Sequence, residues 1–485
     1  MRPSFAVYRQ QDQEYSGGFE QLLRREKTLY SVCDRETEDP VICFENIFPS
    51  WAYAYVEKGG IAIVSGAGRN TFSFDAGFTA RASLEYIDLS DFDQGKTRIC
   101  SAVCLFAGEG KGKMTAHENR TIKDHRYPGF YPVFLYRKLG KGTIIYSGVP
   151  LVQLLTHEGS DLRQTGILPD YDERVSSIDK QKIASAVKSV LVEAMHVAGL
   201  PYVSLWYYPD GARNLFAFSI DGDGLLKEGV DDLIEVSKQT ATKFVFYISR
   251  QLCETDPEVK EKLQRISEHN IIASHGSIHN GKDSYEENLE DLKILEEWLE
   301  RMNIPYVKSY AAPRGMYCHS LGKALKDAGY RHSRDFGFVI DDYPFFPMNE
   351  GVQDAVLQLP CDGFNVCRMM GVHEEKGLPA PKAEEIISSY QTLIDYKLER
   401  DLPLLFFCHP QYFGLYAKEV YPQLIAYVRE KGVLTGDYVS YGDFWLLRDQ
   451  CEYDADCTEE GLQINIKHMG PQIRICIDGK IQKNV

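Results

Sequence analysis

The sequence lacks a run of apolar residues long enough to cross a membrane, and its N-terminus, MRPSFAVYRQQDQEYSGG, has no apolar core of signal-peptide length. It also lacks clusters of lysine and arginine, since 54 basic residues stand against 70 acidic ones and the formal net charge is −16. Binding to phosphate backbones or anionic membrane surfaces needs such clusters. We therefore expect a cytoplasmic protein without a membrane span and without a nucleic-acid partner.

Paired cysteines, internal repeats and low-complexity tracts are also missing. The 12 cysteines are scattered singly and form no CxxC pair, which excludes the disulfide framework of a small secreted domain and favours reduced, mostly buried thiols. What is present is an ordinary globular composition, with 44% hydrophobic and 26% charged residues. A chain of 485 residues is long enough for about two or three domains.

Residues 1–175 alternate short apolar runs with amphipathic ones, as expected for a parallel sheet flanked by helices. The runs FAVYR, DPVICF and IAIVS predict strands, and the runs GFEQLLRREKTL and SWAYAYVEKGG predict helices. At residues 135–155, the stretch LYRKLGKGTIIYSGVPLVQLL predicts the end of a helix, a glycine-rich turn and a buried strand.

The rest of the chain divides into three parts. Residues 176–205 contain IDKQKIASAVKSVLVEAMHVAGLP, whose helical spacing ends at Gly199 with Pro201 behind it, and this predicts a helix that links two domains. From 206 to 450, strands and helices alternate again, which predicts a barrel of parallel strands with its chemistry at the strand ends. Residues 451–485, with LQINIKH and QIRICIDG, predict a short extension of antiparallel strands.

Four loops in the second half place polar side chains directly after a buried strand. The first contains Asp221 and Asp223 in FSIDGDG, and the second contains His275 and His279 in ASHGSIHN. The third is YAAPRG, and the fourth contains His409 in LLFFCHPQYF. Because an apolar strand fixes the backbone, the loop at its end can direct a polar side chain into a shared cavity.

The two histidines of the second loop indicate a metal site. His275 and His279 are four positions apart and can reach one ion from a single tight turn, in which Gly276 lets the backbone approach closely. Two imidazoles and one carboxylate are a common ligand set of catalytic zinc sites, which leave a fourth position for water. We expect a divalent metal, with Zn²⁺ preferred and Co²⁺ or Ni²⁺ able to replace it. The alternative for Asp221 and Asp223 is that they only cap a turn.

These loops resemble the motifs of the polysaccharide deacetylases of the NodB-homology type, grouped as carbohydrate esterase family 4. FSIDGDG resembles the first motif of the family in its spaced Asp-x-Asp form, and HGSIH resembles the second. YAAPRG matches part of the third motif, an Arg-x-Pro loop, and FFCHP resembles the fifth. The resemblance covers about residues 206–448 and implies a distorted parallel (β/α) barrel of the polysaccharide deacetylase type.

The resemblance also implies a role for each site residue. Asp223, His275 and His279 would hold the metal, Asp221 would be the general base, and His409 would protonate the leaving amine. The implied activity is that of a metal-dependent N-deacetylase, a hydrolase that cleaves the acetamide of an N-acetylated sugar, oligosaccharide or polysaccharide and releases acetate.

The third motif departs from the family pattern, because Ala311 stands where the family has arginine. The family arginine orients the base carboxylate through an ion pair. The nearest cation in this loop is Arg314, so we expect Arg314 to hold Asp221, with Arg334 as an alternative. The loop residues expected to orient the base or to contact substrate are Pro313, Arg314 and Tyr317.

Residues 1–175, with YVEKGGIAIVSG and GKGTIIYSGV, resemble a glutamine-amidotransferase-like domain, which implies a flavodoxin-like α/β fold. Amidotransferases place a nucleophilic cysteine in a glycine-rich turn between a strand and a helix, and none of Cys33, Cys43, Cys100 and Cys104 stands in such a turn. We therefore expect a non-catalytic domain that shapes the substrate groove or mediates homo-oligomerisation.

Two other functions stay open at this point. Relatives of this barrel with the spaced Asp-x-Asp loop include hydrolases of cyclic amides and of other non-glycan amides, so the substrate could belong to that class. A catalytically silent protein that binds carbohydrate or acts as a scaffold is the third reading, suggested by Ala311 and by the non-catalytic first half.

Overall fold

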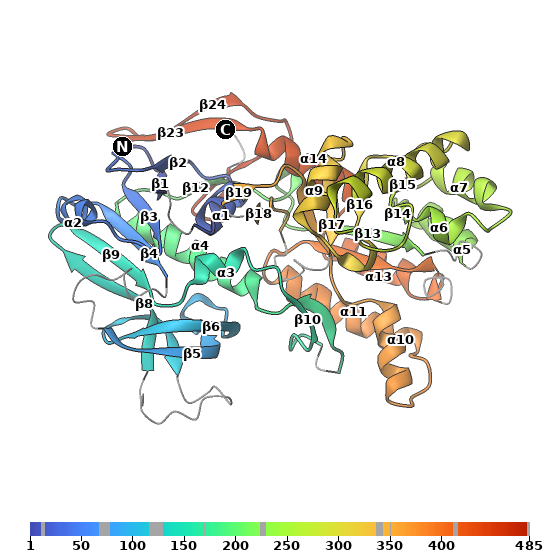
Figure 1. The fold of residues 1–485 in the computed structure, drawn as a ribbon, viewed down its shortest axis with the longest axis horizontal. Coiled ribbons are helices and arrows are strands. Elements are labelled where there is room, and N and C mark those ends of the chain that lie inside the picture. The colour runs from blue at the N-terminus through green and yellow to red at the C-terminus, as the bar shows by residue number, and fades with distance from the viewer. Residues whose placement is uncertain are drawn as a thin grey trace.

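The computed structural model has two halves that lie side by side along its longest axis (Figure 1). The first half carries a large mixed sheet, and the second half carries a barrel with helices around it. None of the helices in the described residues combines the length and the apolar character needed to span a bilayer. The structure describes residues 1–10, 15–66, 78–115, 130–168, 170–223, 229–335, 343–349, 351–410 and 416–482.

The sheet of the first half contains nine strands in the described residues. Five of them are parallel, in the order that defines a flavodoxin-like sheet, and four more continue the sheet in antiparallel pairing. The predicted flavodoxin-like α/β fold is confirmed. Its strands are β1 Phe5–Tyr8, β2 Tyr30–Cys33, β3 Val41–Glu45, β4 Ile61–Ser65, β5 Phe78–Asp88, β6 Lys96–Phe106, β7 Gly110–Thr115, β8 Phe130–Leu139 and β9 Gly142–Ser147, and its helices are α1 Gly18–Glu26, α2 Ser50–Glu57, η2 Ser90–Phe92 and α3 Leu151–Leu155.

The strands predicted at β1, β3 and β4 and the helices predicted at α1 and α2 are confirmed. The helix end predicted at residues 135–139 is wrong, because these residues complete β8, which turns directly into β9. The turn contains Gly140, whose φ is +57° and where a Cβ atom would lie 2.5 Å from the carbonyl oxygen of Glu57. Five residues are too few to distinguish helical from strand spacing, and the tight turn at Gly140 joins β8 and β9 into a hairpin.

A hairpin and a long helix follow the first sheet. The helix predicted within residues 176–205 is present as α4, and its apolar residues Ile183, Val187 and Leu191 lie in one core cluster with Phe5 and Val41 of the sheet. This helix therefore packs into the core of the first half. The elements of the segment are β10 Ser160–Arg163, β11 Glu173–Ser176, α4 Lys180–Val197, β12 Val203–Leu205 and η3 Pro209–Gly211.

The second half is an eight-stranded sheet in which every pairing is parallel and which curves into a nearly closed barrel. A backbone hydrogen bond from Asp362 to the carbonyl of Leu405, 2.8 Å long, bridges the two edges of the sheet. The predicted parallel barrel is confirmed. In spatial order its strands are β20 Leu357–Pro360, β17 His332–Asp335, β16 Ser309–Ala311, β15 Ile271–Ser274, β14 Val245–Ile248, β13 Leu215–Gly222 and β21 Leu404–Cys408, with β22 Leu434–Thr435 paired to the start of β13.

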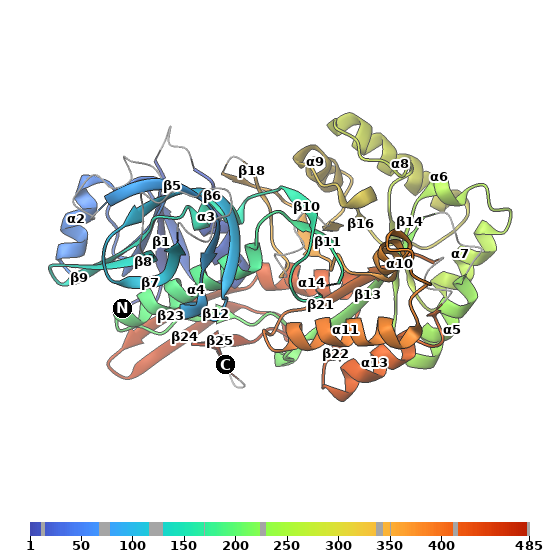
Figure 2. The same ribbon diagram turned by 90° about the horizontal axis from the view of Figure 1, so that it is seen from below.

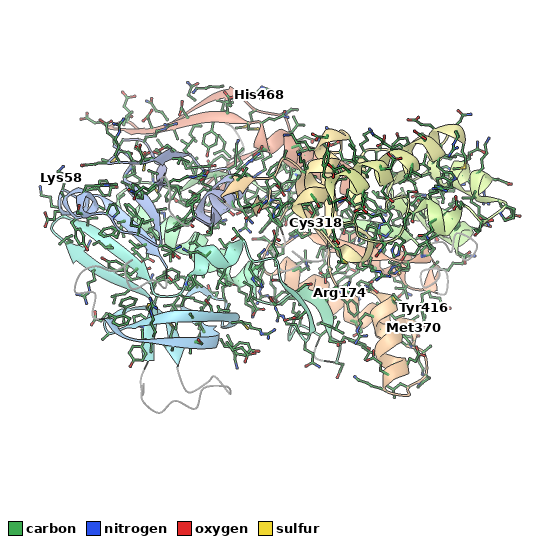
Figure 3. The ribbon with its side chains drawn as sticks, viewed as in Figure 1. Lys58, Arg174, Cys318, Met370, Tyr416 and His468 are labelled. Atoms are coloured by element: carbon green, nitrogen blue, oxygen red, sulfur yellow. The ribbon has the colours of Figure 1, made fainter. Side chains whose placement is uncertain are left out.

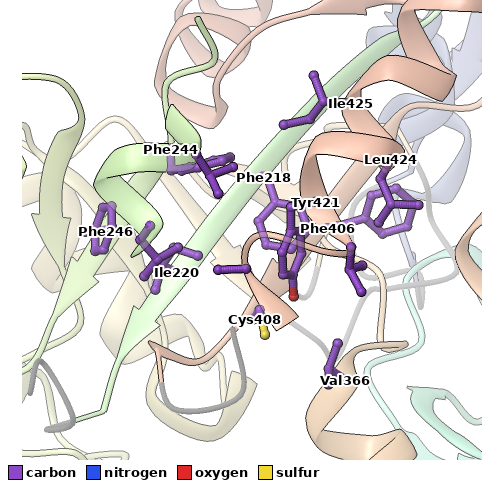
Figure 4. Packing of buried hydrophobic residues seen from close by; sticks show 14 of the residues in the cluster. Phe218, Ile220, Phe244, Phe246, Val366, Phe406, Cys408, Tyr421, Leu424 and Ile425 are labelled. Atoms are coloured by element: carbon purple, nitrogen blue, oxygen red, sulfur yellow. The ribbon is translucent and has the colours of Figure 1, made fainter. Parts of the chain in front are cut away.

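Alternation along β13 determines which side chains enter the barrel. Phe218 and Ile220 pack outward among Phe406 of β21 and Tyr421 of a surrounding helix (Figure 4), and the rings of Phe218 and Tyr421 are 5.1 Å apart. Because successive residues of a strand face opposite sides, Asp221 faces the inside of the barrel. The helices and remaining short elements of this half are α5 Val230–Thr240, α6 Arg250–Cys253, α7 Val259–Ser267, α8 Tyr285–Arg301, η4 Pro313–Gly315, α9 His319–Asp327, β18 Met348–Asn349, β19 Val352–Gln353, α10 Val366–Glu375, α11 Ala383–Leu398, α13 Tyr421–Glu430 and α14 Tyr438–Asp449.

The C-terminal segment returns to the first half, as Figures 1 and 2 show. One antiparallel hairpin reaches the start of the chain, where the amide of Cys457 donates to the carbonyl of Met1 at 2.9 Å. The predicted antiparallel extension is confirmed, whereas the domain boundaries stay a prediction. Its strands are β23 Glu452–Thr458, β24 Gly461–His468, β25 Ile475–Ile477, which pairs with β12, and β26 Lys480–Ile481.

The hairpin β10–β11 buries a carboxyl group against the barrel. Glu173 on β11 is 3% exposed. Burial and the charge of Asp362 raise the pKa of Glu173 to about 8, although Lys397, whose Nζ lies 2.9 Å from Asp362, acts in the opposite direction. Since this pKa is higher in the folded than in the unfolded chain, the group stabilises the fold at low pH, and that contribution is lost as the pH rises through about 8.

We expect Glu173→Gln to remove this pH dependence. The free energy of unfolding of the wild type should fall relative to that of the variant, by on the order of 2 kcal/mol between pH 5 and pH 9. Urea unfolding of both proteins at the two pH values measures the difference, with the exposed Glu268→Gln as a control. Parallel pH profiles for wild type and Glu173→Gln would contradict the assignment.

Candidate metal centre and active site

Asp223 follows β13 directly and faces three imidazole rings. Its Oδ1 atom lies 3.3 Å from Nε2 of His275 and 3.3 Å from Nε2 of His279, and its Oδ2 atom lies 3.3 Å from Nε2 of His409. Ligand atoms of Asp223, His275 and His279 all lie within 4.8 Å of one another. The structure therefore brings the three predicted metal ligands together and places the predicted proton donor beside them.

The electrostatics of this cluster suit a cation. Burial opposes ionisation of Asp223, but the neighbouring imidazoles of His275 and His409 outweigh it and lower the pKa of that carboxyl below its usual value. Among the described residues, Oδ1 of Asp223 is buried without a hydrogen-bond partner. Buried polar atoms are rarely left unsatisfied, and a divalent ion between two imidazoles and this oxygen would satisfy it. The donor set and its spacing thus fit a metal.

The ring of His275 is held by the neighbouring strand. Its Nδ1 atom lies 2.7 Å from the carbonyl oxygen of Ala311 on β16, so that nitrogen carries the proton and donates it. In the neutral form of the ring, which is the form that binds a metal, the Nε2 atom keeps its lone pair and directs it toward Asp223. A backbone carbonyl behind a histidine is the usual way in which proteins orient a metal ligand. Ala311 contributes to the site through its backbone.

The turn between the two histidines is held by Asp291 on α8. Its carboxylate accepts the backbone N–H groups of Ser277 at 2.8 Å and of Ile278 at 3.0 Å. Gly276 has a φ of +78°, and a Cβ atom there would lie 2.8 Å from the same carboxylate. A side chain at this position would displace Asp291, which explains the glycine between the two histidines.

Asp221 is held by Arg334 on β17, whose guanidinium donates to Oδ1 of the carboxylate. Both residues are buried, and the guanidinium lies over the rings of Tyr247 and Phe407 at 5.1 and 5.0 Å. Burial lowers the pKa of Arg334, but the Asp221 carboxylate outweighs it and raises that pKa well above its usual value. Asp221 is thus oriented inside the barrel by a charged partner.

The ion pair of Asp221 belongs to Arg334 and not to Arg314, contrary to our first expectation. Arg314 follows β16 in the short turn η4, where its side chain is exposed and lines the same cavity as Asp221. Pro313 begins this turn and is buried. Arg334 can reach Asp221 because it lies on a strand of the barrel and points inward.

Tyr317 forms its hydrogen bond away from the cluster of histidines. Its hydroxyl donates to Asp354 at 2.7 Å, and the same carboxylate lies 2.8 Å from His319. The position of Tyr317 therefore does not support the predicted contact with substrate or with the base.

A cavity of about 740 Å³ opens over the cluster at the carboxyl ends of the strands. Asp221, Asp223 and the three histidines line it, together with residues of α10 such as Met370. The first half also contributes to the wall, through Leu162 on β10 and Arg174 on β11. Figure 3 shows Arg174 where the two halves meet and Met370 on α10 of the second half, and Figure 2 shows the hairpin reaching toward the barrel. The predicted role of the first half in shaping the groove agrees with this arrangement.

We expect replacement of both histidines, His275→Ala with His279→Ala, to empty the metal site, because one carboxylate alone is a weak ligand set. The wild type should bind about one Zn²⁺ or Co²⁺ per chain, and the double variant less than about a tenth of that. Metal analysis after dialysis measures both proteins, and His269→Ala, an exposed histidine on the same half, is the control.

Circular dichroism establishes that the double variant is folded, and Asp223→Asn provides a second variant if it is not. Stoichiometric metal in folded protein without the two imidazoles would rule out this site.

No family model matches the sequence, and no curated protein matches it. Solved structures are similar over about half of the chain. A putative polysaccharide deacetylase from Mycobacterium smegmatis is 15% identical over 50% of this chain and 93% of its own, with a TM-score of 0.41. Puue allantoinase is 14% identical over 49% of this chain and 92% of its own, with a TM-score of 0.39. The chitin deacetylase of the fungal pathogen Colletotrichum lindemuthianum is 14% identical over 49% of this chain and 90% of its own, with a TM-score of 0.35. Similarities this weak carry no conclusion about activity, which rests on the site.

Proposed function

We propose that this protein is a metal-dependent hydrolase of amide bonds whose substrate is an N-acetylated sugar or glycan. The observation that carries the proposal is the convergence of Asp223, His275 and His279 on one point, next to the ion-paired Asp221 and the imidazole of His409. All five side chains line one cavity. The resemblance of these motifs to those of polysaccharide deacetylases supports the choice of an acetamide as the bond that is cleaved.

Each residue of the cluster has a defined task in this reaction. A zinc ion held by Asp223, His275 and His279 would polarise the amide carbonyl and acidify the attacking water. Asp221, oriented by the guanidinium of Arg334, accepts the proton that the water loses. His409 donates a proton to the leaving nitrogen. Water is added across the C–N bond, and the products are a carboxylate, acetate for an N-acetyl group, and a free amine.

A non-glycan or cyclic amide is the second candidate substrate. The observation that favours it is the wall that Leu162 and Arg174 add to the cavity, because this wall and the volume of about 740 Å³ suit a small molecule. A catalytically silent protein is less favoured, because Arg334 forms the ion pair with Asp221 that the family arginine, replaced here by Ala311, would otherwise form.

An assay of amide hydrolysis tests the proposal. Protein loaded with Zn²⁺ or Co²⁺ is incubated with N-acetylglucosamine, chitin oligosaccharides and small cyclic amides, and the release of acetate or of free amine is measured. We expect turnover that disappears in metal-free protein and returns when metal is added back. Metal-loaded protein that hydrolyses none of these amides would contradict the proposed function.

A further inference from the structure

The hairpin β10–β11 of the first half is fastened to the barrel at the mouth of the cavity. Just before β11, the hydroxyl of Tyr171 donates to Glu385 of α11 at 2.7 Å, and Asp172 accepts from Nε of Arg368 on α10 at 2.8 Å. The backbones of the hairpin and the barrel also lie close together, since a Cβ atom added to Gly363 would lie 2.7 Å from the carbonyl oxygen of Arg174. The hairpin is therefore a fixed part of the cavity wall.

Two arginines meet at this wall, one from each half of the chain. Nη1 of Arg174 on β11 donates to the carbonyl oxygen of Arg314 in η4 at 2.8 Å. Both side chains are exposed and line the cavity together with His279. A third arginine of the wall, Arg368, is neutralised by Asp172 and Glu375. Among the described residues, the contact found for these two arginines is the one between them, and neither Arg174 nor Arg314 forms an ion pair with a carboxylate there.

The backbone of Arg314 holds its side chain at a fixed place on the cavity wall. Its φ is +58°, in the left-handed region that costs a non-glycine residue about 1 kcal/mol or more. A glycine would adopt this turn with less strain. The buried neighbours Pro313 and Gly315 and the hydrogen bond from Arg174 hold the turn in place. The turn therefore fixes the place from which the Arg314 side chain extends along the cavity wall.

We propose that Arg174 and Arg314 together bind an anionic group of the substrate, a carboxylate or a phosphate, beside the amide that is cleaved. This inference rests on the proposed function and narrows its substrate to an acidic N-acyl compound. Two guanidinium groups can each give paired hydrogen bonds to such a group. A chain with a net charge of −16 does not attract anions at long range, so a local pair of cations is needed to hold one. Glu374 also lines the cavity and would disfavour an anion placed next to it.

Binding to metal-free protein tests the pair without any hydrolysis. The probes are N-acetylglucosamine, which is neutral, N-acetylmuramic acid, which adds a carboxylate, and N-acetylglucosamine 6-phosphate, which adds a phosphate. We expect calorimetric titration to show that at least one acidic probe binds about tenfold or more tightly than the neutral probe. The acidic probe that binds more tightly identifies the anion.

Variants then assign the preference to the two arginines. Arg314→Ala and Arg174→Gln should each reduce the preference for the acidic probe about tenfold, and Arg314→Lys should restore part of it. The control is Arg213→Ala, which removes an exposed arginine that pairs with Asp401 at 2.6 Å outside the cavity wall and should keep the preference. All four substitutions are of exposed side chains, and thermal unfolding establishes that the variants are folded.

Three results would overturn the inference: no binding of any probe, equal binding of acidic and neutral probes to the wild type, or an unchanged preference in both arginine variants. Failure of the proposed function has a different signature. In that case the acidic probe binds through the two arginines, but metal-loaded protein hydrolyses neither the acidic nor the neutral amides.

Discussion

Replacing Asp221 by asparagine is expected to lower kcat for amide hydrolysis on the order of a hundredfold or more while the metal stays bound. An amide of the same shape cannot accept the proton that the attacking water must lose. The proposed metal ligands are Asp223, His275 and His279, and the substitution of Asp221 leaves all three in place. Steady-state kinetics and metal analysis of the same sample measure the two effects separately.

The substitution also leaves the buried guanidinium of Arg334 without its counter-charge. We therefore expect the variant to be less stable, and kcat has to be compared below its unfolding temperature. Asp256→Asn is a matched control, because Asp256 is a buried aspartate that pairs with Lys262 at 2.9 Å away from the cavity wall. It should lose stability without a comparable loss of kcat. Undiminished turnover in Asp221→Asn would assign the base to another group.

The parallel parts of the fold could be predicted from the sequence because their strands are short, wholly apolar runs between turn residues, as in IAIVS at β4. The antiparallel strands β5 and β6 could not be placed. They are inserted between β4 and β9, which are neighbours in the sheet, and they extend its edge. Local spacing does not tell whether such a pair of strands joins an existing sheet or forms its own.

Most of the candidate site could also be predicted, for a geometric reason. Asp223, His275 and His409 each follow a buried strand, and the carboxyl ends of parallel strands lie on the same side of a barrel. The choice between Arg314 and Arg334 could not be made this way, because it depends on which side chain points inward. One signal favoured Arg334, since an arginine within a buried strand needs an opposite charge.

The wall supplied by Leu162 and Arg174 had no signal in the sequence. Arg174 and Arg314 are separated by 140 positions, and their contact joins a side chain to a backbone carbonyl. Neither hydrophobic spacing nor motif chemistry reports a contact of that kind. The first half was expected to shape a groove, but which of its residues would reach the site depends on how the two halves pack.

Removing Arg334 is expected to have the second large effect, on stability and on the pH dependence of the rate. Arg334→Met leaves Asp221 buried without a partner, which should lower the free energy of unfolding by about 3 to 5 kcal/mol. A buried carboxylate without a cation takes up a proton more readily, so the acidic limb of the rate profile should move to higher pH. Arg334→Lys should recover part of both effects, because a lysine keeps the charge but lacks the planar fork.

A double-mutant cycle separates this role from simple loss of packing against Tyr247 and Phe407. If the ion pair is what matters, Arg334→Met should destabilise the Asp221→Asn protein much less than it destabilises the wild type, because the carboxylate it would leave unpaired is already gone. Arg331→Ala is the control, since Arg331 is exposed, pairs with Asp443 at 2.7 Å and should leave the acidic limb in place. Equal destabilisation in both backgrounds, with an unshifted limb in Arg334→Met, would show that the guanidinium only fills space, and the orientation of Asp221 would then need another source.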